Sequence, residues 1–237
     1  MSEPAPAPAI SFFDPSRELY GTAREAASVL FEGRRAHAVG DGPKVERRKG
    51  RVRVELEGSF ALELEPVAAE ADLGGVVARL CRVTGEIGGT SVDCVGTIAE
   101  SKSPPAWDEL DAMRSISAIG DAENAVLALA RRPRGALGHG HELVTAWLLE
   151  AGEPLAVEEA RISTVYDGDG RQRSAGLELW LPGEEFPRRV SGSVIAGSSL
   201  ELEELNVHIA VFRWRMNGRD ATGAYELVAR REPAAAA

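Results

Sequence analysis

Two histidines separated by one glycine are the most suggestive chemical feature of this sequence. They are His139 and His141, and Glu142 follows them directly. On a β-strand, residues i and i+2 project to the same side, so the two imidazoles could bind one metal ion or one polar ligand group. The segment lacks a further carboxylate at the spacing that a metal site of this kind needs. We therefore expect no metal here, and interpret the pair as ligand-binding or proton-transfer residues, or as an ordinary polar strand end.

Carboxylates near the middle of the chain are candidate proton donors. A buried carboxyl group has a raised pKa and can act as a general acid. Glu100 and Asp108 are weak candidates for that role, beside His139 and His141. Lys102 follows Glu100 closely and would instead keep it charged at the surface.

A strand that carries the two histidines would line an apolar space with polar groups at one end. Such a cavity suits a hydrophobic small molecule with one polar terminus. Large aromatic side chains on strands also pack in cores, so each tryptophan has that alternative interpretation. The candidate ligand-binding residues are Trp107, His139, His141, Trp147 and His208.

Several other kinds of chemistry find no support in the sequence. There is no Gly-x-Ser-x-Gly nucleophile elbow, and no glycine-rich phosphate loop between a strand and a helix. Cys81 and Cys94 are too few for a disulfide framework or a zinc site. We expect no cofactor.

The charge balance also limits the partners. The sequence has 27 lysines and arginines against 37 aspartates and glutamates, a net charge of -10. Phosphate backbones and anionic membrane surfaces repel such a chain, so nucleic acid and membranes are poor partner hypotheses. No apolar run approaches the roughly 20 residues of a spanning helix, and the first residues lack the basic and apolar blocks of a signal peptide. We expect a cytoplasmic protein, and the oligomeric state stays open.

Alternation of apolar and charged residues dominates the chain. Residues 52–64 have this pattern on both sides of Gly58-Ser59, which is typical of two paired strands with one face on a core. Residues 162–181 predict a second hairpin, with its turn at residues 167–170. Turn residues recur at strand-like spacing elsewhere, so the sequence predicts an all-β, mainly antiparallel fold. A short helical segment is expected near mid-chain, over residues 104–113.

One long run has apolar residues on both faces. Val207, Ile209 and Val211 share one face, and Phe212 and Trp214 lie on the other. This pattern is typical of a strand at a junction between two sheets, or of a central strand. The parity shifts at residues 203–204, which predicts a β-bulge there.

Two short stretches recur about half a chain apart. Residues 28–39 resemble residues 146–157, and residues 82–93 resemble residues 189–201. Repeats in the same order indicate a duplicated β unit, although strand-turn-strand segments can also look alike by chance. The predicted division is a disordered tail at 1–10, a first β domain at 11–103, a connecting segment at 104–113, a second β domain at 114–232 and a disordered tail at 233–237.

Five short motifs carry a family resemblance. They are Leu-Tyr-Gly-Thr-Ala-Arg at 19–24, Val-Asp-Cys-Val-Gly-Thr at 92–97, Pro-Ala-Trp-Asp at 105–108, Tyr-Asp-Gly-Asp-Gly-Arg at 166–171 and Phe-Arg-Trp at 212–214. Together they resemble the hydroxyneurosporene synthase (carotenoid hydratase) and AttH-type superfamily, over residues 12–231. The resemblance implies two lipocalin-like β-barrels side by side, produced by an internal duplication.

The resemblance also implies a class of ligand. Active members of the family hydrate or cyclise long apolar terpenoids with the help of a general acid. The family commonly has His and Trp-Gly after the position of Gly96, whereas residues 98–103 here are Ile-Ala-Glu-Ser-Lys-Ser. The leading hypothesis is therefore binding of a hydrophobic small molecule, of terpenoid or fatty acyl type, in a lipocalin-like barrel. The alternatives are a hydratase, isomerase or cyclase acting on an apolar isoprenoid, and a protein-interaction module with an exposed apolar patch.

Overall fold

Two curved antiparallel sheets make up the structure, a computed structural model that describes residues 8–231 apart from the side chain of His139. The predicted tails fall mostly outside the described residues. Ten strands form the first sheet: β1 (Ala9–Asp14), β2 (Leu19–Arg24), β3 (Ala27–Glu32), β4 (Arg35–Val39), β5 (Lys44–Arg48), β6 (Arg51–Leu56), β7 (Phe60–Pro66), β8 (Ala71–Asp72), β9 (Val76–Ile87) and β10 (Thr90–Ser101).

The second sheet contains nine strands: β11 (Leu110–Ile119), β12 (Ala125–Pro133), β13 (Leu143–Glu150), β14 (Glu153–Leu155), β15 (Glu159–Tyr166), β16 (Gln172–Trp180), β17 (Arg188–Leu202), β18 (Leu205–Met216) and β19 (Arg219–Arg230). No helix in the described part of the chain is long and apolar enough to cross a membrane. The predicted all-β, antiparallel fold is confirmed.

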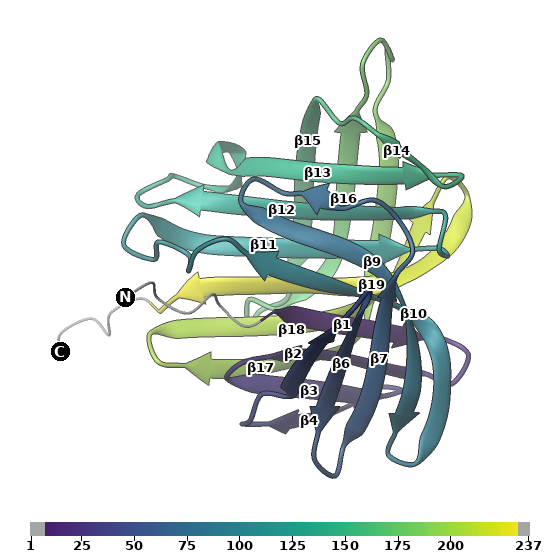
Figure 1. The fold of residues 1–237 in the computed structure, drawn as a ribbon. Helices are drawn as coiled ribbons and strands as arrows, with labels where there is room; N and C mark the ends of the chain where they lie inside the picture. The colour runs from purple at the N-terminus through teal and green to yellow at the C-terminus, as the bar shows by residue number, and fades with distance from the viewer. Residues whose placement is uncertain (1–7, 232–237) are drawn as a thin grey trace, which may run out of the picture.

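Both sheets have the same strand order, as the predicted duplication requires. The orders are β4-β3-β2-β1-β10-β9-β7-β6-β5 and β14-β13-β12-β11-β19-β18-β17-β16-β15. In each sheet the last long strand returns to pair with the first, as Figure 1 shows for β19 beside β11. The repeat of 28–39 at 146–157 occupies equivalent hairpins, β3–β4 and β13–β14.

The two segments of the other predicted repeat do not occupy equivalent positions in the two sheets. Residues 82–93 span the β9–β10 hairpin, whereas residues 189–201 lie within the single strand β17. Segments in which apolar and polar residues alternate around a glycine or serine resemble one another in any part of a β protein. The similarity of these two segments therefore does not indicate equivalent positions in the two sheets.

Several hairpins form where alternation meets a residue with a positive φ. Gly58 (φ 72°) closes β6–β7, and Gly170 (φ 74°) closes β15–β16, both as predicted. At residues 203–204 the structure differs from the predicted bulge. Glu203 (φ 50°) and Glu204 instead form a two-residue hairpin turn between β17 and β18, and pairing of Leu200 with Val207 keeps both on one face.

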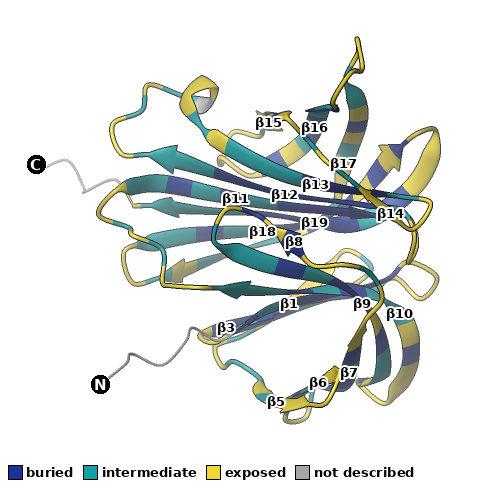
Figure 2. Cartoon of the chain, turned by 45° about the horizontal axis from the view of Figure 1, so that its top comes forward, coloured by how far each residue is buried: buried dark blue, intermediate teal, exposed yellow. Residues whose placement is uncertain are grey.

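The apolar core has three parts. One lies inside the curve of the first sheet, one inside the second, and one between the two sheets. Strand β18 serves two of them, since Val207, Ile209 and Val211 pack between the sheets while Phe212 and Trp214 pack inside the second. The predicted junction strand is confirmed. Figure 2 shows the buried segments concentrated along the strands where the sheets meet.

The helix predicted at residues 104–113 is wrong. Residues 105–109 form turns, in which Trp107 N donates to Pro105 O (2.9 Å) and Glu109 N to Ala106 O (2.9 Å). Strand β11 then begins at Leu110. Two consecutive prolines remove backbone donors at the start of the segment, and strand pairing with β12 begins at Leu110, five residues after the second proline.

Residues 139–141 also differ from the prediction, which placed them on a strand. They form a single 3-10 turn, η1 (His139–His141), in the connection between β12 and β13. Pairing of these strands ends at Arg131 with Leu143, and glycines 135, 138 and 140 interrupt the alternation that would extend it. The two histidines therefore do not lie at i and i+2 of a strand.

A close backbone contact gives a stability prediction. Gly223 lies in β19, and a Cβ built on it would be 1.9 Å from the backbone oxygen of Ser117. We expect Gly223→Ala to lower the free energy of unfolding by about 2 kcal/mol, because the strand must shift to remove the overlap. Gly168→Ala is the control, since nothing lies within 4 Å of its added Cβ. Urea denaturation measures both, and equal midpoints for the two variants would refute the contact.

Candidate functional site

A cavity of about 240 Å³ lies between the two sheets. Strands β1, β2, β9 and β10 line one side, and β11, β12 and β19 line the other, with residues of the connecting segment beside them. Much of its wall consists of small side chains: Ala9, Ala78, Ala99, Ala128 and Ala224. Phe13, Phe31 and Trp147 fill the remainder of the same inter-sheet space. The cavity therefore exists where small residues replace large ones at this interface.

One ion pair crosses the interface at the wall of the cavity. Arg24 on β2 approaches Glu226 on β19, with Nη2 2.5 Å from Oε1 and Nε donating to Oε2 at 3.1 Å. The Glu226 side chain is only 7% exposed. Sequence reasoning missed Glu226, although its neighbours on the same strand face, Thr222, Ala224 and Val228, are small or apolar. A single acidic residue on an otherwise small and apolar strand face is the sequence feature that could have identified Glu226.

Hydroxyl groups add further polarity to an otherwise apolar wall. Ser11 Oγ and Thr97 Oγ1 are 2.6 Å apart, and Ser117 Oγ accepts a hydrogen bond from Ala224 N at 3.0 Å. All four residues line the cavity. Apolar walls with a few convergent polar groups are typical of small-molecule sites.

Among the predicted site residues, Trp107 lines this cavity. Its carbonyl oxygen accepts a hydrogen bond from Arg230 Nη1 at 2.5 Å. Trp147 packs in the core between the sheets. Asp108 is exposed in the turn before β11. The structure thus places the two tryptophans along one interface but only Trp107 at the cavity.

The predicted histidines lie elsewhere. His208 lines a smaller cavity of about 150 Å³, and its Nδ1 is 2.8 Å from Ser199 Oγ. Burial, together with Arg171, lowers its pKa. His141 is exposed in η1, and the side chain of His139 lies outside the described part of the structure. The histidines that are described do not converge with Trp107 on one site.

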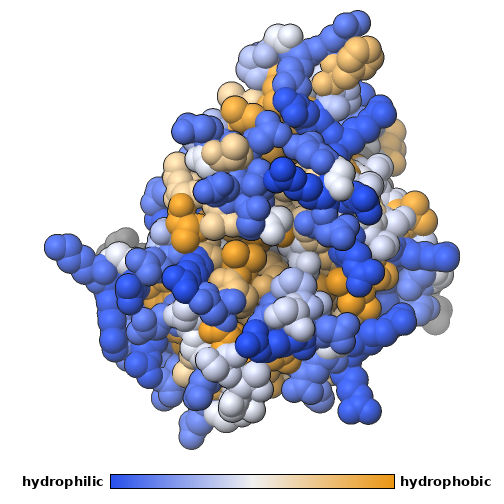
Figure 3. Space-filling view, turned by 90° about the vertical axis from the view of Figure 1, so that its right-hand side faces the viewer, coloured by the Kyte–Doolittle hydropathy of each residue, from blue (hydrophilic) through white to orange (hydrophobic). Residues whose placement is uncertain are grey.

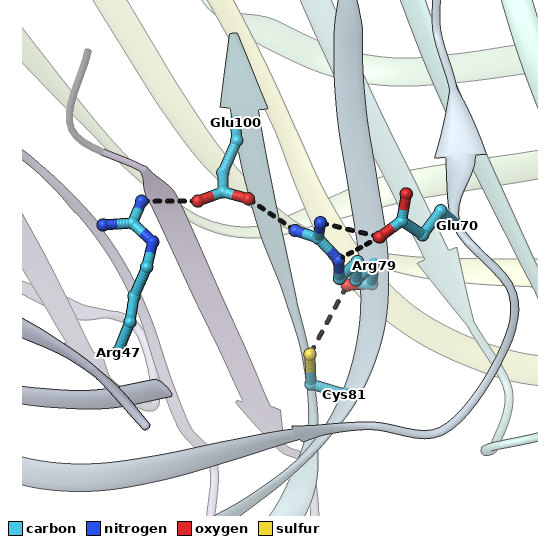
Figure 4. Close-up of polar contacts among 5 residues, drawn as sticks. All are labelled: Arg47, Glu70, Arg79, Cys81 and Glu100. Atoms are coloured by element: carbon cyan, nitrogen blue, oxygen red, sulfur yellow. Dashed lines mark hydrogen bonds and ion pairs between the residues drawn. The ribbon is translucent and has the colours of Figure 1, made fainter. Parts of the chain in front are cut away.

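Glu100 is held between two arginines. Arg47 Nη2 donates to its Oε1 at 2.5 Å, and Arg79 Nη1 to its Oε2 at 2.5 Å, as Figure 4 shows. The hydrogen bond from Arg47, with that from Arg79, lowers the pKa of Glu100 although burial opposes this. Lys102 pairs with Asp72 instead, at 3.1 Å. An ionised carboxylate is poorly suited to the proton-donor role considered for Glu100.

The thiols offer little nucleophilic reactivity. Burial is the main cause that raises the pKa of both Cys81 and Cys94 to about 12, so neither forms a thiolate at neutral pH. Among the described side chains, which do not include that of His139, no three histidines, cysteines or acidic residues come close enough together to hold a metal ion.

Comparison with known proteins points to the fold alone. No protein-family model matches the chain, and no curated protein has a significantly similar sequence. Among solved structures, kievitone hydratase from Nectria haematococca has a TM-score of 0.59 at 10% identity, covering 95% of this chain and 89% of its own. A protein described as an AttH from Nitrosomonas europaea has a TM-score of 0.60 at 13% identity, covering 94% and 91%.

CghA, solved with Sch210972, is similar to the same degree. Its TM-score is 0.58 at 12% identity, and the match covers 95% of this chain and 89% of that one. The resemblance to AttH-type proteins is therefore confirmed at the level of the fold, which is the duplicated lipocalin-like one. These identities are too low to transfer an activity.

The arginines around Glu100 give a pH prediction. Because its pKa in the folded chain lies below the ordinary 4.5, the stabilisation is present above that pH and is lost as the pH falls through the folded value. We expect Glu100→Gln to cost about 1 kcal/mol at pH 7 and to cost nothing in strong acid. Urea denaturation at several pH values measures this, with Glu57→Gln in an exposed turn as control. A pH-independent cost would contradict the assignment.

Proposed function

We propose that the chain binds a small apolar molecule, of terpenoid or fatty acyl type, in the cavity between its two sheets. The observation that carries this proposal is a space of about 240 Å³ with alanine-rich walls and one ion pair, in which the buried Glu226 meets the partly exposed Arg24. The interior of each sheet is occupied by its own apolar core, so the inter-sheet cavity supports binding better than either sheet interior. A cavity of this size favours a narrow ligand.

The polar groups of the cavity set the orientation of the ligand. The Arg24–Glu226 pair and the hydroxyls of Ser11, Thr97 and Ser117 would bind its polar end, while the alanines and Trp107 contact its hydrocarbon part. One structure of this fold, that of CghA, was solved with a small molecule, Sch210972. The cytoplasmic location, and the absence of nucleic acid and membrane partners, stay predictions from the sequence.

The polarity of one face of the molecule argues against the alternative that this face is a protein-interaction surface. Figure 3 shows the molecule from the right-hand side of Figure 1, where hydrophilic side chains separate the apolar ones into small groups. A protein-binding surface of the predicted kind would present a continuous apolar patch.

Filling the cavity tests the binding proposal. Ala99→Phe places a ring in the space that the ligand would occupy, and we expect Kd for farnesol to rise by more than about tenfold, or about 1.4 kcal/mol. Ala61→Phe, on a strand of the same sheet that does not line the cavity, should bind as the unchanged chain does. Tryptophan fluorescence reports binding through Trp107. If both variants bind equally well, the ligand does not occupy this cavity.

A second candidate function is acid–base chemistry on an apolar isoprenoid, of the hydratase, isomerase or cyclase type. The observation that favours it is the carboxylate of Glu226, almost fully buried in the wall of the cavity. Its contact with Arg24 holds this carboxylate in the wall of the cavity, where a general base could remove a proton from a bound substrate. Kievitone hydratase, which shares the fold, is named for a hydration reaction.

Glu226→Gln separates the two functions. Glutamine keeps the size and the hydrogen-bonding oxygen but cannot accept a proton as a base, so turnover of an isoprenoid substrate should fall by roughly 10²–10⁴-fold. Farnesol binding should weaken much less than turnover, since glutamine keeps an oxygen that can accept a hydrogen bond from the polar end of the ligand. Single-turnover assays with acyclic isoprenoids measure the rate, and Glu178→Gln, which removes an acid paired with Arg189 on the surface, is the control. Undiminished turnover in Glu226→Gln would exclude Glu226 as the base.

A further inference from the structure

A second buried polar cluster lies inside the second sheet, on the opposite face of β11 from the inter-sheet cavity. Arg114 projects to the side of Ile116 and Ala118, which belong to the apolar core of that sheet. Its side chain is only 1% exposed. A guanidinium in this position needs compensating partners, since an unpaired buried charge is strongly destabilising.

Three side chains converge on Arg114. Its Nη1 donates to Thr164 Oγ1 at 3.0 Å and to the Tyr225 hydroxyl at 3.1 Å, and these two oxygens are 2.7 Å apart. Its Nη2 donates to a carboxylate oxygen of Glu142. Its Nε is buried and makes no hydrogen bond. Burial opposes the charge of Arg114, but Tyr225 and Glu142 raise its pKa above the ordinary value.

The carboxylate in this cluster comes from a surface segment rather than from a strand. Glu142 ends the connection of residues 134–142, which carries η1 beside the start of β13 (Figure 1). The other end is held by Gly135 N, which donates to Asp111 Oδ2 at 2.9 Å. Between these anchors Leu137 is 95% exposed. Apolar packing of that side chain therefore does not hold the segment down.

We propose that Arg114, Thr164 and Tyr225 form a binding site for the carboxylate of a small apolar molecule, and that Glu142 occupies this site in the present structure. A guanidinium matches a carboxylate in charge and in planar geometry, and Glu142 demonstrates that a carboxylate reaches it. A ligand that takes the place of Glu142 releases residues 134–142, and its hydrocarbon part lies in the volume that the segment leaves. Glu142 is thus an intramolecular competitor that weakens binding.

This site is independent of the function proposed above, because Arg114 and Glu142 do not line the inter-sheet cavity. The test uses octanoate as the probe and 1-octanol as its neutral counterpart, with calorimetric titration of the full chain. Glu142→Gln removes the competing charge, and we expect octanoate to bind at least tenfold more tightly than to the unchanged chain. Binding of 1-octanol should not improve.

Two double variants locate the effect. Arg114→Met with Glu142→Gln should abolish the gain in octanoate affinity, whereas Arg24→Met with Glu142→Gln should retain it. The second result excludes the Arg24–Glu226 pair as the source of the gain. If Glu142→Gln binds octanoate no better than the unchanged chain, or if Arg114→Met leaves the gain intact, the proposal is overturned.

A measurement on the unchanged chain covers the case in which Glu142→Gln does not fold. Saturating octanoate should speed amide hydrogen exchange severalfold in residues 136–142, while strand β12 stays protected and 1-octanol has no effect. Unchanged exchange in the segment would mean that Glu142 is a permanent structural partner of Arg114, and would overturn the proposal.

Discussion

The packing of the two sheets against each other is the constraint on which the rest of the structure depends. Each sheet already surrounds its own apolar core, and a third core joins their outer faces. Strands at this junction need apolar side chains on both sides, as β18 has, whereas strands at the outer edges alternate with charged residues. The junction fixes how the two copies of the duplicated unit are oriented, and it determines which side chains meet across them.

Incomplete packing at this junction produces the candidate site. Where Phe13, Phe31 and Trp147 meet, the space is filled, and where alanines and serines face one another a cavity remains. The ion pair of Arg24 with Glu226 lies at the wall of that cavity and joins strands from different sheets. A binding site in this position belongs to neither copy of the repeat alone, so it can exist only after the copies have docked.

Charged groups in the sheet interiors follow a different principle. Glu100, whose side chain is 27% exposed, is held by two arginines, and the buried Arg114 by hydroxyls and one carboxylate, so both charges have compensating partners. For Glu100 these partners lower the pKa and remove it as a proton donor. For Arg114 one partner, Glu142, comes from a surface connection, whereas both partners of Glu100 lie on strands.

The sequence alone determined the class of fold, the main hairpins and the junction strand, because alternation along a strand records which face meets water. It also named Trp107, which lines the inter-sheet cavity, and the repeat of 28–39 at 146–157, which occupies equivalent hairpins. It misplaced the helix at 104–113 and the histidine pair at 139–141, since prolines and glycines act on the backbone in ways that short periodic patterns do not record. Only the tertiary structure decided that Arg24 contacts Glu226 and that Arg114 contacts Glu142. The residues of these two pairs are 202 and 28 positions apart in the sequence. Whether such distant side chains come into contact depends on how the sheets curve and dock, which no local sequence pattern records.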